Sequence, residues 1–147
     1  MKQTSQDLDA LVSRAARRLS NLTEENASEP LHPAGWSPKQ VLGHLIDSAS
    51  NNHQRFVRAA LQGELQWPSY DQEGCVRVEA FQEASWTMLI EIWSAMNRLL
   101  AHVLAHLPEH AATFRCRIGG EADMPLSQLA AAYVDHMRHH LTQIGAA

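Results

Sequence analysis

The sequence predicts an all-α fold, a single-domain four-helix bundle. Apolar residues recur at spacings of three and four along most of the 147 residues, which is the helical period. These segments are long, and prolines and glycines separate them. Strand-like alternation is limited to residues 113–118. The length suits one domain, residues 1–147, with one hydrophobic core.

The first predicted helix covers about residues 4–26. Its apolar side holds Leu8, Leu11, Val12, Ala15, Leu19 and Leu22. A loop with Pro30, Pro33 and Gly35 separates it from the second helix. Arg14, Arg17 and Arg18 on the first helix form a small basic face, which we interpret as an ordinary solvated surface.

The second predicted helix runs from Pro38 to about Gln62. Ser37 before Pro38 is the preferred order of a helix N-cap and a first helical residue. Gly63 and Pro68 are expected to close this helix, because neither residue continues a helix well. An irregular link containing Tyr70, Asp71 and Gly74 should follow.

The third predicted helix spans about residues 78–107, and the fourth begins near Leu126. Gly119, Gly120 and Pro125 lie in the connection between them. Four amphipathic helices with uneven connections predict a bundle, and facing helices of a bundle can build a metal site in its core. The lengths of the connections leave the topology of the bundle open.

Composition excludes several classes of function. The formal net charge is −4 and there is no dense cluster of lysine and arginine, so a nucleic-acid partner is not expected. Neither a membrane span nor a secretory signal is predicted, because the chain lacks an apolar run of about 18 residues and a charged leader. We therefore expect a cytoplasmic protein. Cys75 and Cys116 match no redox or zinc motif and are expected to be reduced.

The most informative stretch is the last helix, which holds His136 and His140. Two imidazoles four residues apart lie on one face of a helix and can share a metal ion. Both lie along an edge of the apolar stripe, whereas His139 points toward the polar side, where it faces solvent or supports a ligand from outside. His102 and His106 repeat the spacing but lie away from the apolar centre of their helix, so we expect a solvated face there.

A third ligand should come from the second helix, where His44 and His53 are the candidates. Helical periodicity alone favours His53 as the core residue, because it falls nearer the apolar stripe. His44 instead belongs to a polar stripe that continues with Asp47, Ser48, Asn51 and Arg55. A polar stripe most often faces water. If this one lines a wet pocket, it supplies a ligand, a carboxylate, an amide and a guanidinium along one wall.

Three segments carry a resemblance to a known family. The stretch WSPKQVLGHLIDS, residues 36–48, resembles the second-helix signature of the DinB superfamily, in particular its YfiT-like branch, and Asn51, Arg55 and Phe56 continue it. The piece PSYD, residues 68–71, is similar to the Pro-Tyr-Asp loop of that branch with one inserted residue. The stretch HMRHHLTQI, residues 136–144, is similar to the closing helix of the family.

The resemblance implies a four-helix bundle that binds a divalent metal through His44, His136 and His140, and it favours His44 over His53. Relatives include S-transferases that use low-molecular-weight thiols, a mycothiol-dependent isomerase and proteins described as metal-dependent hydrolases. It also implies a small-molecule substrate and a homodimer. The sequence departs from the family around Gly74 and Cys75, where YfiT-like proteins often carry an aromatic residue.

From these residues we expect a metal-dependent thiol S-transferase or hydrolase with zinc or nickel as the metal. Three imidazoles leave a coordination position for a water or a low-molecular-weight thiol, whose pKa the metal would lower. Asp47 is the predicted proton acceptor or orienting group, Asn51 would orient a ligand, and Arg55 would hold a carboxylate. The alternatives are a non-catalytic metal-binding bundle for stress response or interaction, and a metal-free bundle that binds a partner.

Overall fold

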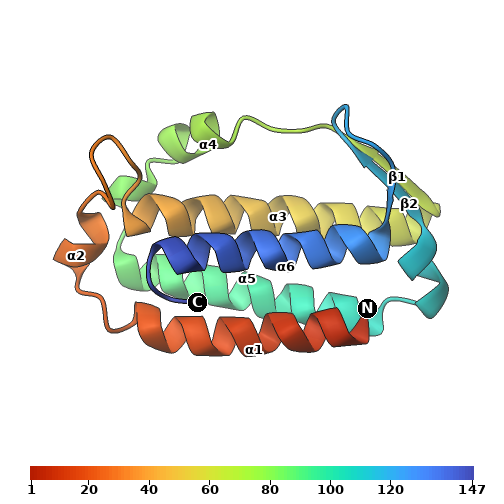
Figure 1. The fold of residues 1–147 in the computed structure, drawn as a ribbon, viewed down its shortest axis with the longest axis horizontal. Coiled ribbons are helices and arrows are strands. Elements are labelled where there is room, and N and C mark those ends of the chain that lie inside the picture. The colour runs from red at the N-terminus through yellow and green to blue at the C-terminus, as the bar shows by residue number, and fades with distance from the viewer.

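Four long helices form the body of the molecule in the computed structural model, which describes residues 1–147 (Figure 1). They are α1 (Lys2–Leu19), α3 (Pro38–Gln62), α5 (Trp86–His106) and α6 (Leu126–Gln143). Helix α5 packs against α1 and α3, and α6 packs against the same two helices. Helices α3 and α5 run in one direction and α1 and α6 in the other. The predicted four-helix bundle is confirmed.

Helix α3 has the ends that its sequence predicts. The Ser37 hydroxyl accepts a hydrogen bond from the Gln40 backbone N–H, and the Gln40 side chain accepts one from the Ser37 backbone N–H. This reciprocal pair satisfies two N–H groups that the first helical turn would leave free. Gly63 ends the helix in the left-handed conformation, with a φ of 81°. The polar stripe of α3 is thereby held in a fixed register against its neighbours.

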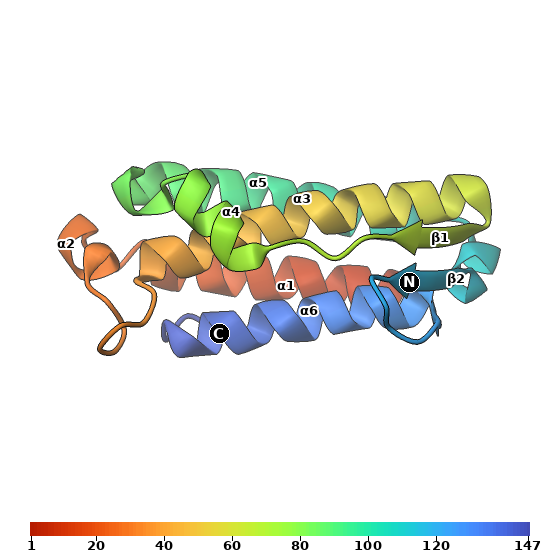
Figure 2. The ribbon, with the colours of Figure 1, turned by 90° about the horizontal axis from the view of Figure 1, so that it is seen from above.

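Two connections carry the irregular parts of the fold. The chain leaves α3 through β1 (Glu64–Trp67), an extended strap of residues 68–71, α4 (Gln72–Val78) and the turn η1 (Phe81–Glu83). The second connection holds η2 (Glu109–Thr113), β2 (Arg115–Ile118) and β3 (Met124–Pro125). Strand β1 pairs with β2 in parallel and β2 pairs with β3 antiparallel. This small sheet lies at one end of the bundle, and the strap returns from it along α3 (Figure 2).

Two predicted helix boundaries are wrong because of local capping residues. The helix expected over residues 4–26 is divided, since Thr23 caps a separate helix, α2 (Glu24–Ser28), by accepting a hydrogen bond from the Asn26 backbone N–H. The helix expected from residue 78 begins at Trp86, where Ser85 is the N-cap. The brief strand expected near residues 113–118 is confirmed as β2.

One continuous cluster of buried apolar side chains fills the space between the helices, as expected for a single domain. Trp93 and Phe56 are the largest side chains in it that are fully buried. Trp86 is also buried, and its indole N–H donates to the Leu19 carbonyl oxygen at the end of α1. None of the helices combines the length and the apolar character that a membrane span requires.

Candidate metal centre

Three histidines from two helices converge in the bundle. His44 lies on α3 and is fully buried, and His136 and His140 lie one turn apart on α6 and are half-buried. The Nε2 atom of His136 is 3.2 Å from that of His44 and 3.1 Å from that of His140. We call these three side chains the three-histidine centre. The structure thus brings together the three residues that the resemblance predicted as ligands.

Hydrogen bonds between the rings cannot account for both of these short contacts between Nε2 atoms. A ring nitrogen of a neutral histidine either carries a proton and donates, or has one lone pair and accepts. The Nε2 atom of His136 can therefore make one of its two close contacts as a hydrogen bond, but not both. A cation between the rings would give every Nε2 lone pair a partner. Zinc–nitrogen bonds of about 2.0–2.1 Å in a tetrahedral site place the nitrogens roughly 3.3 Å apart, close to the separations here.

The environment keeps the three rings neutral. Burial, followed by repulsion from the neighbouring histidines, lowers the pKa of His44 and of His136 to about 4. Burial also lowers the pKa of His140. A neutral imidazole has the free lone pair that metal ligation requires, whereas an imidazolium ion has none. The donor set therefore fits a divalent transition metal at neutral pH.

Gln143 fixes the orientation of one ring. His140 donates from Nδ1 to Oε1 of Gln143, 2.9 Å away, which leaves the Nε2 lone pair directed at the other two rings. The Gln143 amide in turn donates to Nε2 of the exposed His139, at 3.1 Å. The expectation that His139 faces solvent or supports a ligand from outside agrees with this contact. The supporting role of Gln143 was missed, although its spacing of three residues from His140 indicated contact.

The other histidines lie elsewhere. His53 is half-buried beside Met96 and Leu99 of α5, so the preference that periodicity gave it over His44 is wrong. His102 and His106 are exposed, and their rings stack 4.1 Å apart between centroids. The expectation of a solvated face on that helix is confirmed.

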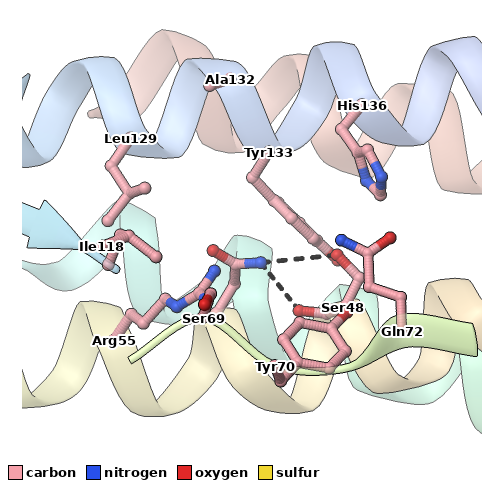
Figure 3. A pocket seen from close by; sticks show the side chains of 11 residues that line it. Ser48, Arg55, Ser69, Tyr70, Gln72, Ile118, Leu129, Ala132, Tyr133 and His136 are labelled. Atoms are coloured by element: carbon pink, nitrogen blue, oxygen red, sulfur yellow. Dashed lines mark hydrogen bonds between the residues drawn. The ribbon is translucent and has the colours of Figure 1, made fainter. Parts of the chain in front are cut away.

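A pocket of about 260 Å³ adjoins the three-histidine centre, and His136 belongs to both (Figure 3). We call it the His136 pocket. Its walls come from α3, the strap and the start of α4, β2 and α6. The lining residues are Ser48, Asn52, Arg55, Ser69, Tyr70, Gln72, Ile118, Leu129, Ala132, Tyr133 and His136. One wall is therefore polar and another apolar, as in many sites for small organic molecules.

The polar stripe of α3 divides between two surroundings. Ser48 and Arg55 are buried and line the His136 pocket, which favours the wet-pocket interpretation of this part of the stripe. Asn51 is half-buried and donates to the Asp47 carbonyl oxygen, outside the pocket wall. Its neighbour Asn52, which the sequence did not single out, lines the pocket and donates to the Ser48 carbonyl oxygen.

Asp47 is buried on the side of α3 that faces α4. Burial and the neighbouring Glu79 carboxyl raise the pKa of Asp47 to about 7. One carboxylate oxygen, Oδ2, has no hydrogen-bond partner. Asp47 therefore exchanges a proton in the neutral range, one helical turn from His44.

Both cysteines are free thiols. Cys75 is half-buried on α4, where burial and the carboxylates of Asp47, Glu79 and Asp71 raise its pKa. Such surroundings disfavour the thiolate, which is the reactive form of cysteine. Cys75 is therefore poorly suited to act as a nucleophile.

The fold and the site together define a class of protein, a helical bundle in which three histidines from two helices converge. The chain belongs to the DinB superfamily, whose family profile matches residues 7–144. Similar sequences include two proteins named "Putative metal-dependent hydrolase", from Bacillus mycoides strain KBAB4 and Bacillus cereus strain AH820. Each is 26% identical to this chain, over 143 and 145 residues respectively, and each alignment covers 95% of this chain and 80% of the relative.

Solved structures show the same fold. YfiT from Bacillus subtilis, which has an unusual four-helix bundle topology, superposes with a TM-score of 0.88 at 19% identity, covering 97% of this chain and 82% of YfiT. A mycothiol-dependent maleylpyruvate isomerase superposes with a TM-score of 0.81 at 15% identity, over 99% of this chain and 60% of the isomerase. The bundle is thus of the YfiT type.

Proposed function

We propose that the protein is a metal-dependent enzyme that acts on a small molecule by hydrolysis or by thiol transfer. The observation that carries the proposal is the shared position of His136, which belongs to the three-histidine centre and also lines the His136 pocket. A molecule in the pocket would lie against the metal site. The names of the hydrolase relatives support metal dependence and hydrolysis.

His44, His136 and His140 would hold the ion through their Nε2 atoms, and zinc or nickel suits three imidazole ligands. The bound ion would supply Lewis acidity, which lowers the pKa of a water or thiol and polarises an electrophile. The half-buried His136 leaves the centre accessible from the pocket.

Asp47 would accept the proton that the attacking water or thiol loses. A base works best when its pKa lies near the working pH, and the Asp47 pKa of about 7 meets that condition. Arg55 would bind a charged group of the substrate from the pocket wall. Asn51 would act indirectly, because its amide holds the Asp47 carbonyl oxygen within α3.

Thiol transfer is the second candidate reaction, and a second opening favours it. A groove of about 490 Å³ lies on the other side of the centre. It is lined by Leu31, His32, Trp36, Val41, Glu73, His140 and Gln143. His140 thus contacts this groove while His136 contacts the pocket. A low-molecular-weight thiol in the groove and an electrophile in the pocket could reach the centre from opposite sides.

Elemental analysis of protein purified without a chelating tag tests the metal site first. Wild type and His53→Ala should carry near-stoichiometric metal, whereas His44→Ala and His136→Ala should carry almost none. Circular dichroism of every variant checks the fold. Wild type that takes up no zinc or nickel, even after incubation with either ion, would refute the proposal.

Turnover is tested next, on metal-loaded and chelated protein. Panels of esters and amides alone test hydrolysis, and electrophiles with added thiols test transfer. Metal-dependent turnover that His44→Ala abolishes is the expected result. A stoichiometric metal with no turnover in any panel would instead favour the non-catalytic metal-binding bundle.

A further inference from the structure

We propose that the His136 pocket is a carboxylate site, in which Arg55 binds the single carboxylate group of a compact small molecule. The description of this molecule as the substrate rests on the proposed function. The binding site itself is inferred from the pocket alone.

Arg55 is a buried cation without an acidic partner. Its residue surface is 8% exposed, it takes part in none of the ion pairs of the chain, and its Nε atom has no hydrogen-bond partner. Lys39, the only other buried lysine or arginine, is paired with Glu24. Burying a charge is unfavourable unless a counter-charge and hydrogen bonds compensate. The pocket therefore contains a positive charge that an anionic ligand would neutralise.

No group lining the pocket can supply that negative charge. None of the eleven lining residues is an aspartate or glutamate. Tyr70 also lines the wall, but burial, followed by the charge of Asp47, raises its pKa to about 12, so that its hydroxyl stays protonated. Tyr70 and Ser69 are neutral groups that can donate hydrogen bonds beside the Arg55 guanidinium, and Gln72 is a further neutral donor near His136.

The pocket favours a carboxylate over a phosphate. One guanidinium balances one negative charge and matches the two oxygens of a carboxylate. No second cation lines the wall to balance a doubly charged phosphate. Ile118 and Leu129 provide an apolar surface for a short hydrocarbon portion, and the volume of about 260 Å³ limits the ligand to a compact molecule.

The two functional ends of the pocket are separate. Figure 3 shows Arg55 beside Ser69 at one end and His136 beside Gln72 at the other. Ile118 and Leu129 lie at the Arg55 end, so a molecule that binds Arg55 through its carboxylate must span the pocket to bring its other end to the three-histidine centre. This orientation would place a bond distant from the carboxylate at the reacting position.

The test is a titration of chelator-treated protein with butyrate, butyramide and inorganic phosphate, followed by NMR. Chelation prevents the carboxylate from binding to an ion. Butyrate should bind saturably to wild type, and butyramide and phosphate at least about tenfold more weakly. Arg55→Gln should weaken butyrate binding by about tenfold or more, Arg55→Lys by less, and the exposed Arg58→Gln not at all.

Three results would overturn the inference: no saturable butyrate binding to wild type, equal binding to Arg55→Gln, or tighter binding of phosphate. Spectra of each variant without ligand verify folding, and Arg55→Lys keeps the charge if Arg55→Gln does not fold. The metal content of Arg55→Gln is measured separately. If Arg55→Gln loses butyrate binding and keeps its metal content, the result supports this inference and does not concern the proposed function. Absence of metal from wild type would contradict the proposed function and not this inference.

Discussion

Asp47 is buried and has a carboxylate oxygen without a hydrogen-bond partner. Its pKa can be measured through the pH dependence of the free energy of unfolding. Its pKa is about 7 in the folded protein, against 3.8 as the ordinary value. Between these values the unfolded chain is ionised and the folded chain retains the proton. Raising the pH through this interval therefore favours unfolding, and the cost stops growing above about pH 7.

We predict that Asp47→Asn becomes more stable relative to wild type as the pH rises. Two pH units of differential ionisation, from pH 5 to about pH 7, correspond to an increase of about 2.7 kcal/mol between pH 5 and pH 8. Urea unfolding of chelated protein at both pH values measures it. Asp9→Asn, at an exposed position on α1, is the control and should show no such change. An equal stability difference at both pH values would contradict the raised pKa.

The same substitution should alter catalysis if Asp47 is the proton acceptor. Activity of wild type should rise with pH through about 7, because the ionised carboxylate is the active form. Asp47→Asn should lose about two orders of magnitude in kcat/KM and also lose this rise. Metal content is the control for both proteins. An unchanged pH profile in Asp47→Asn would assign the proton transfer to another group.

The residues of the centre show what a single sequence can predict. The spacing of His136 and His140 was sufficient to predict that their rings lie together. Both residues belong to one helix, so their relative position does not depend on how that helix packs against its neighbours. The choice between His44 and His53 depends on which side of α3 faces α6, and only the packing of the bundle decides that. The resemblance favoured His44, which the structure places beside His136 and His140. Asn52 was missed because it lies on the side of α3 that the strap covers. The position of the strap cannot be predicted from apolar periodicity.

At the scale of elements, capping residues explain both the successes and the errors. Ser37 and Gly63 lie at the ends of a long periodic segment, so they were identified in advance. Thr23 and Ser85 lie inside segments whose apolar spacing continues. Periodicity alone therefore predicted helices that include these two capping residues. Strand β1 was missed because four residues give too short an alternation, and its pairing with β2 joins distant parts of the chain.

The contact between α3 and η1 gives a prediction at this scale. A Cβ atom added to Gly43 would overlap the Phe81 ring, well inside van der Waals distance. Alanine gains about 1 kcal/mol in helix propensity, but displacing a packed ring costs about 1–3 kcal/mol. We expect Gly43→Ala to destabilise the protein by about 1 kcal/mol and to weaken metal binding through the adjacent His44.

Urea unfolding and zinc titration check this expectation. Gly120→Ala is the matched control, since no atom lies within 4 Å of the Cβ atom it would add. It should change stability by no more than about 0.5 kcal/mol. A Gly43→Ala protein as stable as wild type would show that Phe81 moves aside without cost.

At the scale of the whole molecule, the three-histidine centre joins parts of the chain that are far apart in sequence. His44 and His136 are separated by 92 positions, and apart from the centre α3 and α6 are held together by packing alone. A ligand that binds the folded state and not the unfolded chain stabilises the fold by mass action. A metal ion at the centre should therefore act as a crosslink between the second and the last long helix.

We predict that zinc at about 100 times its dissociation constant stabilises the wild type by about 2.7 kcal/mol, which corresponds to a rise in Tm of roughly 10 °C. Thermal unfolding by circular dichroism, with and without a chelator, measures the rise. His44→Ala should abolish it, because the remaining pair lies on α6 alone and no longer links two helices. His53→Ala should keep it. A rise that survives in His44→Ala would mean that zinc stabilises the fold from another position, and the exposed pair His102 and His106 would be the first to substitute.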